Sequence, residues 1–376
     1  MADDRCAAPY RVLSLDGGGV RGLYSAVLLR QLAGRLASRR NRSCGGEFDI
    51  GGAFDLIAGT STGSILGIAL AAGVPLERVI SMYRNESGRI FQRPKPSPNG
   101  RDWFGYLSLA AWVARCWASP ANESEALRAA LESVLGDETL GQLYQRRRIA
   151  LCVPTINATT ERAWVFKTPH APRLRRDTDC PLVDVCMASA AAPIYFPVHG
   201  LEIPDPSTTV PNWYVDGGLW ANNPVLVALV EALEMAPPDV PIEILSVGTC
   251  SPTPANSIGR QGSKRGVWAW KGGASVVTMS QEAQAFAMPY MASVISKATR
   301  RVTLYRLEDA KISSSQSTHL ALDSVDSKSL DTLESLARIA TDENISTLTN
   351  AQAGTPESDM VLGMFSNLTP LISEVQ

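Results

Sequence analysis

Twice near its start, the chain repeats one succession: a short apolar run, a glycine-rich turn and an apolar helix pattern. The first copy spans residues 11–36 around a turn at 16–22. The second copy spans residues 54–72 around a turn at 59–63. Strands that alternate with helices in this way form parallel sheets covered by helices, and ligand chemistry gathers at the carboxyl ends of the strands. The sequence therefore predicts an α/β fold with both turns at one edge of a sheet.

The rest of the chain continues this alternation less regularly. Further strands are predicted near residues 148–156, 162–166, 214–216, 242–247 and 302–305, and helices near 124–135, 182–191 and 224–233. Residues 89–122 break the pattern with clustered prolines followed by aromatic residues, which indicates an insertion. We expect a tail over 1–8, a core over 9–250 that contains the insertion, and a helical cover of the same domain over 251–376.

Composition limits the partners of the chain. Its 35 basic and 37 acidic residues give a formal charge of −2, so no global field attracts a nucleic-acid polymer. The longest apolar helix pattern, residues 65–74, is much shorter than the roughly 20 residues that span a bilayer, and the start lacks a secretory signal. Seven scattered cysteines without a C-x-x-C pair favour reduced thiols over disulfides or a metal site. We therefore expect a cytoplasmic protein that binds no metal.

The second turn has the form of a nucleophile elbow, a sharp turn between a strand and a helix. Ser61 stands between Gly59 and Gly63, and small residues at these positions let the chain turn sharply. The alternative is an ordinary turn with a serine that caps the helix. The apolar run before the turn and the apolar helix pattern after it favour the elbow. Ser61 is therefore the candidate nucleophile.

A serine hydroxyl needs a base, and the chain has only three histidines. A Ser, acid, His order would select His319, which lies in a polar stretch typical of a surface loop. The better candidate is Asp216, at a predicted strand end before Gly217 and Gly218, because glycines permit close backbone approach. A carboxylate gains basicity where it is poorly solvated. The alternative role for this residue is a turn or capping aspartate.

The first turn offers hydrogen-bond donors. Gly17, Gly18 and Gly19 precede a predicted helix, so their N–H groups can point into one concavity suited to an oxyanion or a phosphate. Arg21 adds positive charge nearby. Gly17, Gly19 and Gly22 also fit the dinucleotide pattern G-x-G-x-x-G, which requires an acidic residue at the end of the second strand. That strand runs into the elbow instead, which argues against a nucleotide oxidoreductase.

Together these segments resemble the patatin-like phospholipase family. The loop at 16–22 is similar to its oxyanion loop, the turn at 59–63 to its elbow, and residues 216–218 to its Asp-Gly-Gly motif. Further similar segments lie at 188–196, 222–224 and 246–249. The order and spacing of these segments agree over about residues 9–250.

The resemblance implies a three-layer α/β/α fold with a central, mostly parallel sheet. It implies a Ser–Asp dyad in which Ser61 is the nucleophile and Asp216 the base, with the N–H groups of Gly17, Gly18 and Gly19 as the oxyanion hole. No cofactor takes part in this chemistry. The implied reaction is hydrolysis of the fatty acyl esters of membrane phospholipids through an acyl-enzyme, at the inner face of the membrane.

Residues 251–376 resemble the family less specifically. Trp268, Trp270 and the segment 279–284 are similar to bacterial patatin-like effectors that cyclic nucleotides activate in anti-phage defence. This implies a cyclic di- or trinucleotide as activator; the alternative is a plain helical cover with both tryptophans in the core. The aromatic residues at 103–117 fit buried packing as well as a lid or a membrane-docking face.

The sequence is compatible with two other functions. The first is a catalytically idle module that binds lipid or nucleotide, although binding alone needs no hydroxyl beside a carboxylate. The second is acyl transfer or proteolysis by the same dyad. The preferred head group, the acyl position that is cleaved and the oligomeric state, a homo-oligomer included, do not follow from the sequence.

Overall fold

The computed structural model describes residues 8–38, 47–96, 103–202, 211–252 and 274–371. The strands are β1 (Tyr10–Leu15), β2 (Leu56–Gly59), β3 (Ala150–Asn157), β4 (Arg162–Lys167), β5 (His199–Leu201), β6 (Asn212–Asp216), β7 (Ile242–Val247) and β8 (Val302–Arg306). The α-helices are α1 (Gly22–Ser38), α2 (Thr62–Ala72), α3 (Leu76–Ile90), α4 (Trp103–Cys116), α5 (Glu125–Leu135), α6 (Leu140–Arg147), α7 (Leu182–Ser189), α8 (Gly218–Ala221), α9 (Val225–Met235), α10 (Ala274–Thr299), α11 (Ser314–Ser317), α12 (Ser327–Ser346) and α13 (Pro356–Ser366).

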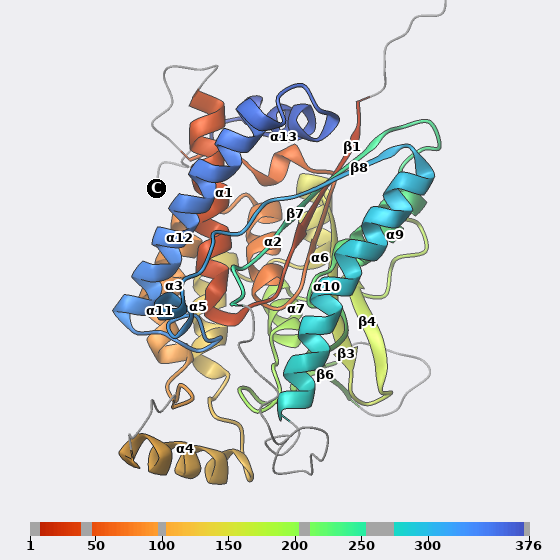
Figure 1. Ribbon diagram of the computed structural model, residues 1–376. Helices are drawn as coiled ribbons and strands as arrows, with labels where there is room; N and C mark the ends of the chain where they lie inside the picture. Colours follow the sequence, from red (N-terminus) through yellow and green to blue (C-terminus); the bar gives the residue numbers. More distant parts are fainter. Residues whose placement is uncertain (1–7, 39–46, 97–102, 203–210, 253–273, 372–376) are drawn as a thin grey trace, which may run out of the picture.

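Within these residues the strands form one mixed sheet in the order β5-β6-β3-β2-β1-β7-β8, with β4 paired to β3. Strands β3, β2, β1, β7 and β8 run parallel, whereas β4 and β6 pair antiparallel with β3. Strand β3 meets β2 over residues 150–152 and meets β6 over residues 155–157. The turns that follow β1 and β2 therefore lie at one edge of the sheet, as the repeated sequence pattern predicts (Figure 1).

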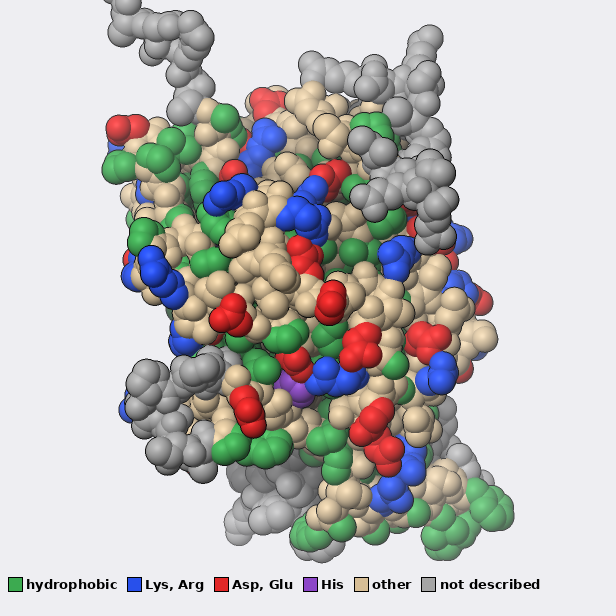
Figure 2. Space-filling model, turned by 180° about the vertical axis from the view of Figure 1, so that it is seen from behind, with side chains coloured by type: hydrophobic (Ala, Val, Ile, Leu, Met, Phe, Trp, Pro, Cys, Tyr) green, Lys and Arg blue, Asp and Glu red, His purple; other side chains and the backbone are tan. Residues whose placement is uncertain are grey.

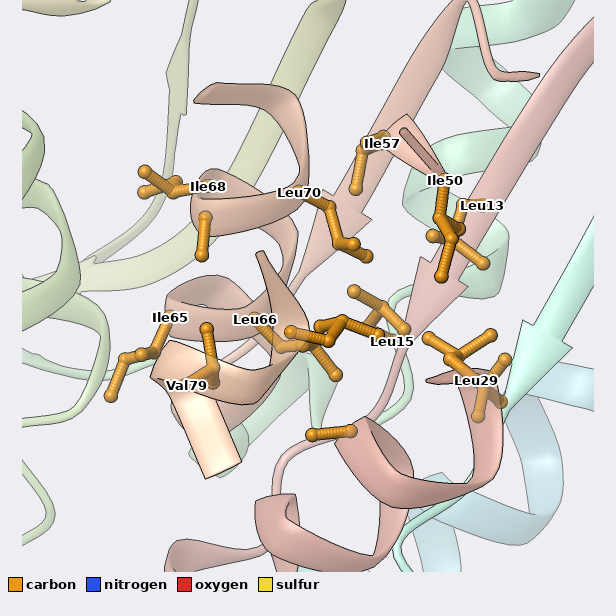
Figure 3. Close-up of a cluster of buried hydrophobic side chains, with 14 of the residues drawn as sticks. Leu13, Leu15, Leu29, Ile50, Ile57, Ile65, Leu66, Ile68, Leu70 and Val79 are labelled. Carbon is orange, nitrogen blue, oxygen red and sulfur yellow. The ribbon is translucent and has the colours of Figure 1, made fainter. Parts of the chain in front are cut away.

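Helices cover both faces of the sheet (Figure 1). Side chains along a strand alternate between the faces, so Leu13 and Ile57 enter a core with α1 and α2, while Val12 and Leu56 pack toward α9 and α10. Figure 3 shows α2 side chains of the first core beside Leu15. This arrangement confirms the predicted three-layer α/β/α fold with a mostly parallel central sheet.

The insertion contains a helix that the sequence pattern did not reveal. Helix α4 is apolar on most of its sides, so its residues show no contrast with a period of 3.6 residues. It lies away from the body of the molecule (Figure 1). Trp103 and Trp117 are exposed and Trp112 is half-buried, so buried packing is wrong for the two exposed tryptophans.

The C-terminal part is continuous with the sheet and its helical layers. Strand β8 pairs with β7, and α12 packs against α1. These contacts support the prediction that residues 251–376 cover the same domain as the core over 9–250, and that division stays a proposal. Trp268 and Trp270 lie outside the described residues. No helix in the described part of the chain is long and apolar enough to cross a membrane.

Candidate active site

Ser61 stands at the sharp turn between β2 and α2. Its φ of 54° and ψ of −122° are unusual for a residue with a side chain, and such backbone strain gathers at functional sites. A Cβ on Gly59 would lie 2.2 Å from the carbonyl oxygen of Gly63, so the turn requires glycine. The Ser61 side chain does not cap α2; its Oγ donates a hydrogen bond to Oδ2 of Asp216 at 2.8 Å. The alternative of a capping serine is therefore wrong.

Asp216 ends β6 and is buried beside Ser61. Its Oδ1 accepts a hydrogen bond from the N–H of Gly218 at 2.6 Å. A Cβ on Gly217 would lie 2.1 Å from the carbonyl oxygen of Pro154, so a close backbone approach holds the strand end in place. Burial raises the pKa of Asp216 to about 6, against the smaller lowering effects of its two hydrogen bonds. The carboxylate is ionised at neutral pH and is more basic than an exposed one, as a general base should be.

The rate of ester hydrolysis should therefore follow the ionisation of Asp216. We expect kcat/KM for a water-soluble ester to be level above about pH 7 and to fall about tenfold per unit well below pH 6, because the protonated carboxyl cannot accept the serine proton. Initial rates measured from about pH 4.5 to about 8.5, with circular dichroism to verify folding, test this. A rate that stays level down to about pH 5 would exclude Asp216 as the base.

The glycine loop after β1 faces the serine. The N–H of Gly17 donates to the carbonyl oxygen of Asn222 at 2.8 Å, so it is not free to bind an oxyanion. Among the described residues, the N–H groups of Gly18 and Gly19 have no acceptor, and both glycines line the same cavity as Ser61. The structure thus narrows the proposed oxyanion hole to Gly18 and Gly19.

Two residues that the sequence analysis did not assign hold this loop. Nη2 of Arg306, at the end of β8, lies 2.7 Å from Oδ2 of Asp16, and its Nη1 donates to Oγ of Ser246 at 2.8 Å. Oγ1 of Thr249 donates to the carbonyl oxygen of Gly17 at 3.1 Å. Arg306 lies far along the chain in no recognisable motif, so no sequence signal connects it to the loop.

A cavity of about 350 Å³ opens beside the serine. Its polar lining includes Ser61, Asp216, Arg21 and Glu282. Its wall is mainly apolar and includes Ile65, Met82, Tyr83, Ile90, Phe91, Leu127, Ala190, Ala192 and Phe196. Arg21 is 7% exposed, its Nη1 donates to the carbonyl oxygen of Leu320 at 3.3 Å, and its Nε has no partner. Arg21 forms no salt bridge with a described carboxylate, although Glu282 also lines the cavity and acts on it electrostatically. Arg21 is the one cationic side chain among the described lining residues, so it is the group there that can attract an anion.

All three histidines lie in the described part of the chain, and none lines this cavity. His170 bonds Glu231 at 2.8 Å, His199 bonds Asp184 at 3.0 Å, and His319 follows a short polar helix. The structure therefore provides no Ser–His pair at Ser61.

One cluster has ligand types suited to a metal. Cys152, His170 and Glu231 place one ligand atom each within 4.8 Å of the others. However, Lys167 also bonds Glu231, and burial raises the pKa of the Cys152 thiol far above its usual range. A protonated thiol and an ammonium group fit a buried polar cluster better than a metal site.

Residues 13–229 match the family model for patatin-like phospholipases. The chain belongs to the patatin-like phospholipase family. The matched segment contains the glycine loop, Ser61 and Asp216. As a patatin-like phospholipase, the chain is an esterase of the lipid hydrolase class.

Relatives of this patatin-like phospholipase occur in bacteria and plants. A cGAMP-activated phospholipase of Vibrio cholerae serotype O1 is 33% identical over 268 residues, which cover 69% of this chain and 70% of that protein. A protein of the same name from Pseudomonas aeruginosa is 33% identical over 266 residues, 70% of this chain and 69% of that one. Patatin-like protein 1 of Arabidopsis thaliana is 26% identical over 338 residues, 83% of this chain and 77% of that one.

Proposed function

We propose that the protein is a phospholipase A that cleaves fatty acyl esters of membrane phospholipids with Ser61 as nucleophile and Asp216 as base. The observation that carries the proposal is the 2.8 Å hydrogen bond between these side chains, in a buried site beside a mainly apolar cavity. The apolar wall suits a fatty acyl chain, because burial of methylene groups is favourable. Arg21 suits the phosphate of the head group, because guanidinium binds phosphate oxygens in pairs.

The reaction follows from the geometry of these groups. Oγ of Ser61 attacks the ester carbonyl carbon while its proton passes to Oδ2 of Asp216. The N–H groups of Gly18 and Gly19 stabilise the oxyanion. When the ester bond breaks, Asp216 returns the proton to the leaving lysolipid oxygen and the acyl group stays on the serine. Water then attacks the acyl-enzyme and gives its proton to Asp216. The carboxyl group passes this proton to Oγ as the fatty acid leaves.

We further propose that a cyclic dinucleotide activates the protein. The support is the sequence similarity to two proteins named cGAMP-activated phospholipase, each aligned over more than two thirds of its own length. We place this activity in anti-phage defence. No residue is assigned to the nucleotide.

The test is fatty-acid release from mixed phospholipid vesicles, measured by mass spectrometry with and without each member of a panel of cyclic di- and trinucleotides. We expect release of free fatty acid and lysolipid, and strong dependence on one dinucleotide. A nucleotide that neither binds in calorimetry nor changes release would disprove the activation. If no condition gives release, the idle binding module becomes the better function. Acyl-lysolipid or acyl-alcohol products in place of free fatty acid would indicate acyl transfer.

A further inference from the structure

Helix α4 exposes an apolar surface that the rest of the described chain does not cover. Phe104 is 80% exposed, and Trp117, the residue directly after the helix, is 83% exposed. Among the helix residues whose side chains are described, Gly105, Leu109, Trp112 and Cys116 form a half-buried stripe and the others are exposed. A helix that is apolar on most sides is normally buried, and exposed apolar patches mark interaction sites. In Figure 2 hydrophobic side chains gather at the lower right, where α4 lies.

This surface is connected to the wall of the active-site cavity. Nε1 of Trp112 donates to the carbonyl oxygen of Arg93 at 3.0 Å, and its ring centroid lies 6.3 Å from that of Tyr195. Tyr195 lines the cavity that contains Ser61. Whatever binds the outer side of α4 therefore lies close to the cavity.

The charge around α4 identifies the kind of partner. Residues 89–122 carry five Lys or Arg side chains and a single Asp, although the whole chain has a formal charge of −2. Arg115 is exposed, and Arg93 is half-buried and donates from Nη1 to the carbonyl oxygen of Ala121 at 3.4 Å. Neither guanidinium forms a salt bridge with a described carboxylate. Basic side chains beside exposed tryptophan and phenylalanine complement a surface that is apolar inside and anionic outside.

We propose that α4 docks the protein on an anionic phospholipid bilayer, with Trp103, Phe104 and Trp117 inserted at the acyl boundary and Arg93 and Arg115 at the lipid phosphates. A helix of 14 residues is about 21 Å long, so α4 lies in the interface and does not span it. Docking rests on the proposed function, since a bilayer holds the proposed substrate. It brings lipid to the cavity beside Tyr195.

The experiment measures binding apart from catalysis. In a Ser61→Ala background, which leaves the vesicles intact, the double change Phe104→Ala and Trp117→Ala is compared with Phe286→Ala on α10. Phe286 is 82% exposed and so matches Phe104. Co-sedimentation with phosphatidylglycerol vesicles should show about tenfold or greater loss of partitioning for the double variant and none for Phe286→Ala. Phosphatidylcholine vesicles should bind more weakly, and added salt should weaken binding to phosphatidylglycerol.

Three results would overturn the proposal. The variant with Phe104→Ala and Trp117→Ala could partition onto vesicles like wild type, Phe286→Ala could lose as much binding as that variant, or the protein could bind both vesicle types equally. A dimer, seen by sedimentation velocity, that the double variant dissociates would also overturn it, because α4 would then bind a second copy of the chain. Thermal unfolding excludes misfolding as the cause of a loss. Binding that depends on α4, with no fatty-acid release from wild type in the presence of any nucleotide of the panel, would leave docking intact and refute the proposed phospholipase A activity.

Discussion

Replacement of Ser61 by alanine should abolish ester hydrolysis, lowering kcat by about 10⁴-fold or more, because no other hydroxyl of the described residues is bonded to Asp216. The loss should appear with vesicles and with a water-soluble ester, and thermal unfolding should change little. Ser296→Ala on α10 is a matched control, since this buried hydroxyl bonds only the carbonyl oxygen of Ser293. Substantial activity in Ser61→Ala with either substrate would refute the assignment of the nucleophile.

Asp216→Asn should lower kcat by a similar factor. The variant that combines Ser61→Ala with Asp216→Asn should lose little more activity than either single variant, because the two groups act as one unit.

The thermal stability of Asp216→Asn should rise although its activity falls. The folded-state pKa of Asp216 is raised to about 6, so ionisation of the buried carboxyl costs stability as the pH rises through that value. We expect a higher Tm for Asp216→Asn than for wild type at about pH 8, with the difference shrinking toward about pH 4. If Asp216→Asn has a lower Tm than wild type at both pH values, damage to the fold explains its lost activity.

Gly63→Ala should damage stability and catalysis together. A Cβ at this position would lie 2.3 Å from the carbonyl oxygen of Leu15 and 2.7 Å from that of Asp16. Both atoms are backbone, so α2 must move away from the glycine loop and separate Ser61 from the proposed oxyanion donors. We expect a loss of about 3 kcal/mol in the free energy of unfolding, measured in urea.

Gly88→Ala is the matched control for this change. Gly88 lies inside α3, and a Cβ there meets nothing within 4 Å. Alanine should stabilise the protein by about 0.5 to 1 kcal/mol, because it favours the helix and restricts the unfolded chain. If Gly63→Ala has the same free energy of unfolding as wild type while Gly88→Ala is stabilised, α2 and the glycine loop do not pack closely enough to require glycine at residue 63.

The sequence predicted the fold well where strand and helix patterns alternate. Strands β1, β2 and β7 appear within two residues of their predicted positions, because apolar runs bounded by glycine turns are strong local signals. Helix α3 was not predicted although the signal was present, since Leu76, Val79, Ile80 and Tyr83 are buried at helical spacing. Helix α4 was missed because an apolar helix has no polar face to give contrast.

The sequence also located the groups that the site brings together. Ser61 and Asp216 stand at strand ends beside glycines, and such local patterns can be read without the fold. The engaged N–H of Gly17 and the bond from Arg306 to Asp16 depend on distant backbone and side chains, so the sequence could not reveal them. The catalytic roles themselves remain predictions that the variants above test.

Strand β3 sets the distance between Ser61 and Asp216, because it pairs with β2 at one end and with β6 at the other. Its first residues fix β2, which leads to Ser61, and its last residues fix β6, which ends at Asp216. Between them, the carbonyl oxygen of Pro154 accepts a hydrogen bond from Ser189, whose Oγ accepts one from the N–H of Ser61. A redesign that aims to lengthen or shorten the gap between hydroxyl and carboxylate should therefore edit β3, a strand that contributes neither group.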